Sequence, residues 1–112
     1  MPLIIQQHLV SGDSVQRFAR VLSDQPQTAT RLAHADANTL LIEAIFNGQP
    51  VAILLGSRQD VGCRIEALGV HPATRGRGVY SELLRKGSPL LPNPIEWAEP
   101  VRTLAKKFLT PA

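Results

Sequence analysis

The spacing of hydrophobic and polar residues predicts alternating strands and helices from the N-terminus onward. Leu3 to Val10 is rich in Ile, Leu and Val and predicts a first strand. An amphipathic helix follows, because apolar residues recur at intervals of three and four positions: Val15, Phe18, Ala19 and Leu22. This helix should end before Pro26, and a shorter, weaker helix is predicted over Thr28 to Ala35.

The middle of the chain predicts three consecutive strands. Thr39 to Phe46 and Pro50 to Gly56 are apolar runs joined by Asn47-Gly48, a strong signal for a tight turn, so the pair should form an antiparallel hairpin. The polar stretch from Gly56 to Gly62 predicts a second turn. Cys63 to Val70 then forms the fourth strand, which completes a meander.

The last third of the chain predicts two helices around a short strand. Ser81 to Lys86 favours helix and is ended by Gly87-Ser88-Pro89. Pro94 to Ala98 is a short fifth strand, and Val101 to Leu109 is a final amphipathic helix. The order β-α-α-β-β-β-α-β-α indicates an α+β fold with helices on a mainly antiparallel sheet. We expect residues 1–112 to form one domain.

Composition narrows the class of protein. A chain of 112 residues that is 44% hydrophobic and 19% charged is typical of one soluble globular domain, and no apolar run is long enough for a signal peptide or a membrane span. We therefore expect a cytoplasmic protein. A single cysteine excludes an intramolecular disulfide, and no Cys/His cluster has the spacing of a metal site. The net charge of +3 and the five aromatic rings (three Phe, one Tyr, one Trp) do not favour nucleic acid, so the basic excess suits a smaller anion.

The segment with the clearest chemistry runs from Leu68 to Leu84 and reads LGVHPATRGRGVYSELL. A strand ends near Pro72, and a loop with two glycines and two arginines leads directly into a helix. Glycines let a ligand approach the backbone, the first helical turn offers unpaired N–H groups, and Arg75 and Arg77 provide forked donors for phosphate. These features predict a pyrophosphate site. The alternative from the residues alone is an ordinary glycine-rich turn with solvated arginines.

The same segment resembles the acetyl-CoA-binding motif of the GCN5-related N-acetyltransferase (GNAT) superfamily. That motif reads Arg/Gln-x-x-Gly-x-Gly/Ala and follows a strand that ends in Val-x-Pro. Arg75 and Gly78 occupy its first two defined positions, whereas Tyr80 stands in place of the final small residue. The predicted order of elements also matches the family, from the first strand to the helix after the fifth.

The resemblance implies that acetyl-CoA is the cosubstrate. Its pyrophosphate would lie against the loop and the first turn of the helix, formed by Arg75, Gly76, Arg77, Gly78, Val79, Tyr80 and Ser81. Leu68 and Val70 would pair their backbones with the pantetheine arm in the manner of an added strand. A bulge in their strand would separate it from the fifth strand and open a slot for the thioester. Arg85 or Lys86 would approach the ribose phosphate.

The resemblance also implies a catalytic base. GNAT enzymes often use a glutamate of the fourth strand to remove a proton from the amine, and a tyrosine of the last helix to protonate the thiolate. Glu66 is the only carboxylate in the predicted fourth strand and is the candidate base, with a strand carboxylate held in an ion pair as the alternative. The usual tyrosine has no counterpart, because the last helix carries Ala105, Lys106 and Phe108 near that position.

Other polar residues receive structural interpretations. His71 is read as a solvated turn histidine, Cys63 as a small buried residue and Trp97 as part of the core. Glu96 and Glu99 fall near the fifth strand, where acceptor pockets form in the family, and their charges would attract an amine.

Three readings of function follow. The first is an N-acetyltransferase that moves acetyl from acetyl-CoA to a small-molecule or protein amine. The alternative is a non-catalytic acetyl-CoA sensor, similar to the activator of aspartate decarboxylase maturation; the third is an α+β module without a ligand. The family continues into two further strands that wall the acceptor pocket, whereas this chain stops at Ala112. Either half the acceptor site is missing, or a homodimer completes the sheet, or the chain binds acetyl-CoA without chemistry.

Overall fold

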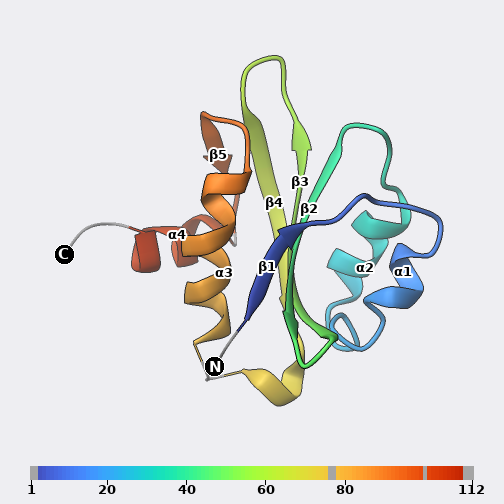
Figure 1. The fold of residues 1–112 in the computed structure, drawn as a ribbon. Coiled ribbons are helices and arrows are strands. Elements are labelled where there is room, and N and C mark those ends of the chain that lie inside the picture. The colour runs from blue at the N-terminus through green and yellow to red at the C-terminus, as the bar shows by residue number, and fades with distance from the viewer. Residues whose placement is uncertain (1–2, 76–77, 100, 110–112) are drawn as a thin grey trace.

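Five strands form one mixed sheet in the order β1-β2-β3-β4-β5 (Figure 1). The computed structural model describes residues 3–75, 78–99 and 101–109, and in these ranges the strands are β1 Ile4–Gln7, β2 Thr39–Phe46, β3 Gln49–Arg58, β4 Cys63–Val70 and β5 Ile95–Trp97. Neighbouring strands from β1 to β4 are antiparallel, whereas β5 runs parallel to β4. The three-strand meander predicted for the middle of the chain is therefore confirmed.

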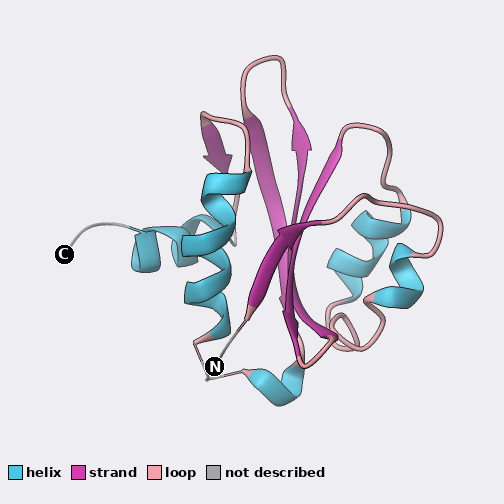
Figure 2. Cartoon of the chain, viewed as in Figure 1, coloured by secondary structure: helices cyan, strands magenta, loops and turns pink. Residues whose placement is uncertain are grey.

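Helices cover both faces of the sheet (Figure 2). The helices of the described residues are α1 Ser14–Arg17, α2 Pro26–Ala33, α3 Val79–Gly87 and α4 Val101–Leu109, with short 3-10 turns at Pro72–Thr74 and Ser88–Leu90. In Figure 1 the pair α1 and α2 lies on one side of the sheet and the pair α3 and α4 on the other. The α+β class and the predicted order of elements are confirmed.

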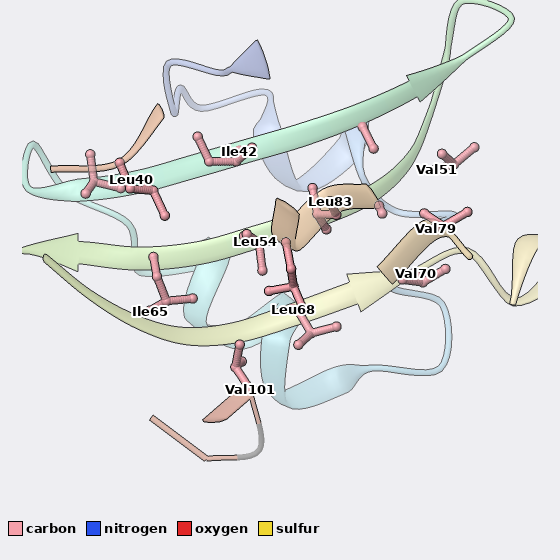
Figure 3. Packing of buried hydrophobic residues seen from close by; sticks show 14 of the residues in the cluster. Leu40, Ile42, Val51, Leu54, Ile65, Leu68, Val70, Val79, Leu83 and Val101 are labelled. Carbon is pink, nitrogen blue, oxygen red and sulfur yellow. The ribbon is translucent and has the colours of Figure 1, made fainter. Parts of the chain in front are cut away.

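The larger core lies between the sheet and α3. Alternation along β2 points Leu40, Ile42 and Ala44 to this side, where they meet Leu83, which is fully buried. Figure 3 shows Leu83 beside Ile42 and Leu54 of the sheet. Because α3 is fixed by this packing, its N-terminus is held at a defined place beside the end of β4.

The smaller core lies under α1 and α2. Phe18, Val21, Leu22 and Leu32 pack there against the opposite side chains of β2, β3 and β4, including Leu41. Glu43 belongs to this face of β2 and is only 1% exposed. This core fixes the connection between α1 and α2, which approaches the outer edge of β4.

The first helix is shorter than the apolar spacing predicts. The expected helix should continue toward Pro26, but α1 ends at Arg17 and the chain continues in turns whose hydrogen bonds include i→i−3 pairs, such as Ala19 N to Gln16 O (3.3 Å). Pro26 does not follow a helix but occupies the first turn of α2. Proline suits that position because its missing N–H has no helical partner there. The residue before a proline is disfavoured in helix, and Gln25 accordingly has φ −128° and ψ 66°, so an α-helix cannot run directly into Pro26.

The remaining elements differ from prediction only at their ends. The strand β1 ends at Gln7 rather than Val10, and α2 ends at Ala33 rather than Ala35. The strand β3 continues to Arg58, because Arg58 still pairs with Cys63 of β4 and donates its N–H to the Asn38 carbonyl at 2.7 Å.

Candidate functional site

The strand β4 separates from β5 halfway along its length. Their parallel pairing covers only Cys63 to Ile65 of β4. On the other side of β4, Gly56 of β3 pairs with Ile65 and the preceding residue pairs with Ala67, so Glu66 is the extra residue of a bulge. The predicted bulge is thus confirmed. Beyond it, within the described residues, no strand covers the outer edge of β4.

Close backbone contact explains why a glycine lies opposite this bulge. A Cβ atom added to Gly56 would lie 2.2 Å from the Arg64 carbonyl oxygen and 2.8 Å from Cδ1 of Ile65. Any larger residue would push β4 away from β3, so Gly56 permits the irregular register that opens the edge.

The backbones of Leu68 and Val70 face this open edge. His71 donates its N–H to the Val51 carbonyl of β3 at 2.8 Å. Because the backbone groups of successive residues in a strand point to opposite sides, those of Leu68 and Val70 point away from β3. Their carbonyl oxygens accordingly accept bonds from side chains outside the sheet: Leu68 from the Thr28 hydroxyl (3.4 Å), and Val70 from Arg75.

The N-terminus of α3 lies at the end of this edge. Gly78 caps the helix in the left-handed conformation, with φ +78°. The first helical hydrogen bond is donated by Glu82 to Gly78, so α3 provides no acceptor for the N–H groups of its first three residues. A cavity of about 190 Å³ opens here, lined by Val70, Thr74, Arg75, Gly78, Val79, Tyr80 and Ser81. The predicted loop residues Gly76 and Arg77 lie outside the described residues.

A second cavity, of about 390 Å³, lies at the other end of the open edge. Its lining comes from the start of α2, from β4 and from the β5–α4 connection: Asp24, Gln25, Pro26, Gln27, Thr28, Arg31, Glu66, Ala67, Leu68 and Glu99. Glu66 contributes a carboxylate that is 30% exposed and ion-paired with Arg31 (Oε2 to Nη1, 3.0 Å) and Arg64 (Oε1 to Nε, 3.6 Å). The Glu66 carboxylate therefore lies where the open edge meets the bulge.

This arrangement is that of a known family. Residues 10–99 match the model of the acetyltransferase (GNAT) family. The chain belongs to the GNAT family. No curated protein matches the sequence.

Solved structures share the fold at low sequence identity. A ribosomal-protein-alanine N-acetyltransferase from Brucella melitensis biovar Abortus is 16% identical with a TM-score of 0.69, and the alignment covers 100% of this chain and 94% of that one. A GNAT family acetyltransferase from Staphylococcus aureus is 15% identical with a TM-score of 0.65, over 88% and 87% of the two chains. The aminoglycoside N-acetyltransferase AAC(6')-Iy, solved in complex with CoA, is 18% identical with a TM-score of 0.56, over 97% and 91%. At these identities the comparisons show the GNAT-like fold.

The GNAT-motif arginine, Arg75, is held by an acidic residue of the connection between α1 and α2. Its guanidinium forms a two-bond ion pair with Asp24, Nη1 to Oδ2 at 2.7 Å and Nη2 to Oδ1 at 2.6 Å. The hydrogen bond from Arg75 holds the pKa of the Asp24 carboxyl below its usual range. The ion pair is exposed and therefore adds only a little to the free energy of unfolding. This contribution is fully present above the ordinary pKa of aspartate and is lost as the pH falls through the lowered pKa of Asp24.

Tyr80, which departs from the family pattern, lines the cavity beside α3 and packs against the larger core. Burial raises the pKa of its hydroxyl, so the phenol stays protonated at neutral pH. Because Glu66 lines the other cavity, Tyr80 is placed near the expected pyrophosphate and not beside the candidate base.

The other predicted polar residues have structural partners. His71 Nδ1 accepts the Ala73 N–H at 3.1 Å, in keeping with its reading as a turn residue. Glu96 pairs with Arg64. Glu99 lines the larger cavity and accepts a bond from the Thr103 hydroxyl at 2.8 Å.

Cys63, Trp97 and the two basic residues of α3 lie outside both cavities. Cys63 is buried, as expected, and burial raises the pKa of its thiol, which disfavours the nucleophilic thiolate. Trp97 is partly buried and packs against the larger core. Arg85 and Lys86, expected near a ribose phosphate, both pair with Glu82 on α3 at 3.1 and 2.9 Å.

Sequence reasoning missed the residues that the connection to α2 brings to the open edge. Asp24, Thr28 and Arg31 contact Arg75, Leu68 and Glu66 respectively, across separations of 51, 40 and 35 residues. No motif spacing joins such distant positions. The only local signal is the cluster of polar residues around Pro26.

The described ranges contain neither a metal-binding cluster nor a membrane-spanning helix. There, no three His, Cys, Asp or Glu side chains lie together as a metal site requires. No helix of those ranges is long and apolar enough to cross a bilayer.

Proposed function

We propose that this GNAT chain binds acetyl-CoA along the open edge of β4 and transfers its acetyl group to an amine. The observation that carries the proposal is the loss of β5 pairing at the Glu66 bulge. It leaves the backbones of Leu68 and Val70 facing a gap that begins at the N-terminus of α3. A pantetheine arm carries amide groups that can pair with such an edge, and a pyrophosphate suits a helix N-terminus.

In this proposal the chain's own residues hold the two ends of the cosubstrate. The N–H groups of Val79, Tyr80 and Ser81, together with Gly78 and the loop that precedes it, cradle the pyrophosphate. Leu68 and Val70 pair with the pantetheine, which directs the thioester toward the cavity that Glu66 lines.

Glu66 is the proposed base. Glu66 takes one proton from the ammonium, directly or through water, and the neutral amine nitrogen then bonds to the acetyl carbon while the carbon–sulfur bond breaks. The nitrogen releases its second proton to solvent, and the thiolate takes one proton from solvent. The products are an N-acetylated amine and the free thiol of CoA. Oε2 of Glu66 is bonded to Arg31 at 3.0 Å, whereas Oε1 lies 3.6 Å from Arg64, so Oε1 is the oxygen proposed to take the proton.

Binding is tested by thermal unfolding. Acetyl-CoA at about 100 times its dissociation constant should add about 2.7 kcal/mol to the free energy of unfolding, which raises the melting temperature by about 10 °C in a domain of this size. S-acetylpantetheine, which lacks the pyrophosphate, is the control and should raise it much less. If acetyl-CoA does not move the melting temperature, the proposed function fails.

Catalysis is tested by replacing the candidate base. Glu66→Gln should lower the rate of CoA thiol release with a panel of amines by about 10²- to 10⁴-fold and leave acetyl-CoA affinity within about twofold. Glu96→Gln is the matched control, because Glu96 also pairs with Arg64 but does not line the cavity. An unchanged rate in Glu66→Gln would exclude Glu66 as the base.

The second candidate function is a non-catalytic acetyl-CoA sensor. The ion pairs of Glu66 with Arg31 and Arg64 favour it, because they give this carboxylate a structural role without chemistry. The absence of a tyrosine from the sequence of α4 points the same way. A wild-type protein that binds acetyl-CoA but releases no thiol with any amine would support the sensor.

A further inference from the structure

Arg75 joins two parts of the chain across the open edge of β4. Its Nε and Nη2 donate to the Val70 carbonyl at 3.3 and 3.1 Å, while Nη1 and Nη2 hold the carboxylate of Asp24. Asp24 lies two residues before the start of α2, and Val70 is the last residue of β4. One guanidinium therefore ties the α1–α2 connection to the end of the strand.

The Asp24–Arg75 pair stands between the two cavities. Asp24 lines the larger one, which contains Glu66, and Arg75 lines the smaller one beside the N-terminus of α3. The strand β4 contributes Leu68 to the first and Val70 to the second. A ligand that runs along β4 from α3 to Glu66 must therefore pass this ion pair.

Both carbonyls of the open edge are already bonded to side chains. Arg75 takes the carbonyl of Val70, and the Thr28 hydroxyl takes that of Leu68 with a long bond of 3.4 Å. A pantetheine arm would need these same carbonyls, and the two bonds from Arg75 occupy both lone pairs of the Val70 oxygen, so the arm has to displace Arg75. The bond from Thr28 is weak at this length, and Arg75 is the stronger obstacle.

We propose that the Asp24–Arg75 pair is a gate that the pyrophosphate of acetyl-CoA opens. The inference rests on the proposed function. A guanidinium binds a carboxylate and a phosphate through the same planar fork, so the pyrophosphate competes with Asp24 for Arg75. Arg75 then turns from Asp24 to the pyrophosphate and frees the Val70 carbonyl for the pantetheine.

The exposure of the pair makes this exchange feasible. The side chains of Arg75 and Asp24 are 36% and 48% exposed, so an anionic ligand can reach the guanidinium without unfolding the core. An exposed ion pair stabilises a fold only weakly, whereas a pyrophosphate offers more than one negative charge to the same fork. Asp24 is thus a positioning residue that sets the fraction of molecules able to bind.

The gate also connects the two ends of the site. Once Arg75 releases Asp24, the connection that leads into α2 loses one of its attachments to the end of β4. This connection lines the cavity with Glu66. Binding of the cosubstrate is therefore communicated to the place where the acceptor amine would enter.

Asp24→Asn tests the gate by calorimetric titration with CoA. The apparent affinity of a site is reduced by the fraction of molecules in the closed state, so removing the competing charge should tighten CoA binding. We expect about a fivefold lower dissociation constant, a change in the range that an exposed ion pair can produce. Mere structural damage at Asp24 would weaken binding and cannot produce this gain.

Two further variants separate the explanations. Glu96→Gln removes an equal charge from another arginine-paired carboxylate and should leave CoA affinity within about twofold. Arg75→Ala should weaken binding, because the pyrophosphate loses its guanidinium.

Three outcomes would overturn the proposed gate. If Asp24→Asn binds CoA no more tightly than Glu96→Gln, there is no gate. If Arg75→Ala binds as tightly as Asp24→Asn, Arg75 only blocks the edge and the proposed exchange is wrong. If wild type and all variants bind no CoA, the proposed function itself fails and the gate falls with it.

Discussion

Glu43→Ala should lower the free energy of unfolding by about 3 kcal/mol. Glu43 is 1% exposed in the middle of β2. Its Oε1 accepts two bonds from Arg17 (Nε, 3.2 Å; Nη2, 2.8 Å), and its Oε2 accepts one from Gln6 Nε2 (2.9 Å) and lies 3.4 Å from His8 Nδ1. Removing the carboxylate leaves these groups without their acceptor.

The magnitude follows from the exposure of the partners. Breaking a buried pair by removing one member costs about 3–5 kcal/mol, because the other charge is left desolvated. The Arg17 side chain is 39% exposed and can regain water, which places the loss at the lower end of that range. Urea unfolding measures it directly as a lower midpoint at an unchanged slope.

Two further variants show whether the burial of Glu43 causes the loss of stability. Glu96→Ala removes a carboxylate that is 58% exposed and paired with Arg64, and it should change the free energy of unfolding by no more than about 0.5 kcal/mol. The double variant Glu43→Leu with Arg17→Met removes both charges and should recover most of the loss. A Glu43→Ala protein as stable as Glu96→Ala would contradict the assignment of Glu43 as a buried residue that holds β1 and α1 to β2.

The strands could be predicted because their signals are local. Asn47 and Gly48 both have positive φ, +52° and +76°, as a tight hairpin turn with this pair of residues requires. The near-continuous apolar run of β2 matches a strand covered by helices on both faces. In these segments the residue pattern and the tertiary fold favour the same conformation, so the interpretation from sequence is confirmed.

The first helix shows where local signals are insufficient. Phe18 and Leu22 are buried, as the helical spacing predicts, but the chain leaves the α-helix after Arg17. The guanidinium of Arg17 is bound to Glu43 of the sheet, and Pro26 must begin the next helix. Both constraints come from parts of the chain that a helical period does not describe.

Part of the candidate site could also be predicted from local sequence, and part could not. The loop before α3 could be predicted, because its glycines and arginines lie within a few residues of one another. The partners of that loop could not be predicted, because Asp24 lies 51 residues from Arg75 and only the tertiary fold brings the two together. The bulge at Glu66 is likewise a property of pairing with Gly56, and the family resemblance, rather than residue spacing, led us to expect it.

Gly78→Val should lower the affinity for CoA at least tenfold. Gly78 has φ +78°, where a β-branched residue is strongly disfavoured, so valine turns this residue toward negative φ. The rotation redirects the N–H groups at the start of α3, beside the cavity that Gly78 lines. This change removes the cradle proposed for the pyrophosphate.

The chain contains a matched control for backbone strain. Gly48, in the hairpin turn between β2 and β3, has φ +76°, and a Cβ added there has no atom within 4 Å, as is also true of Gly78. Gly48→Val should therefore lower the melting temperature about as much as Gly78→Val. It should leave CoA affinity unchanged, because Gly48 does not line either cavity of the candidate site.

The pair of variants separates strain from binding. Calorimetric titration with CoA measures affinity, and thermal unfolding without CoA measures the cost of strain in each variant. A loss of affinity confined to Gly78→Val, at equal loss of stability, means that the left-handed residue before α3 serves the ligand. If Gly48→Val and Gly78→Val bind CoA equally well, the helix N-terminus does not hold the pyrophosphate, and the open edge of β4 must bind the cosubstrate in another orientation.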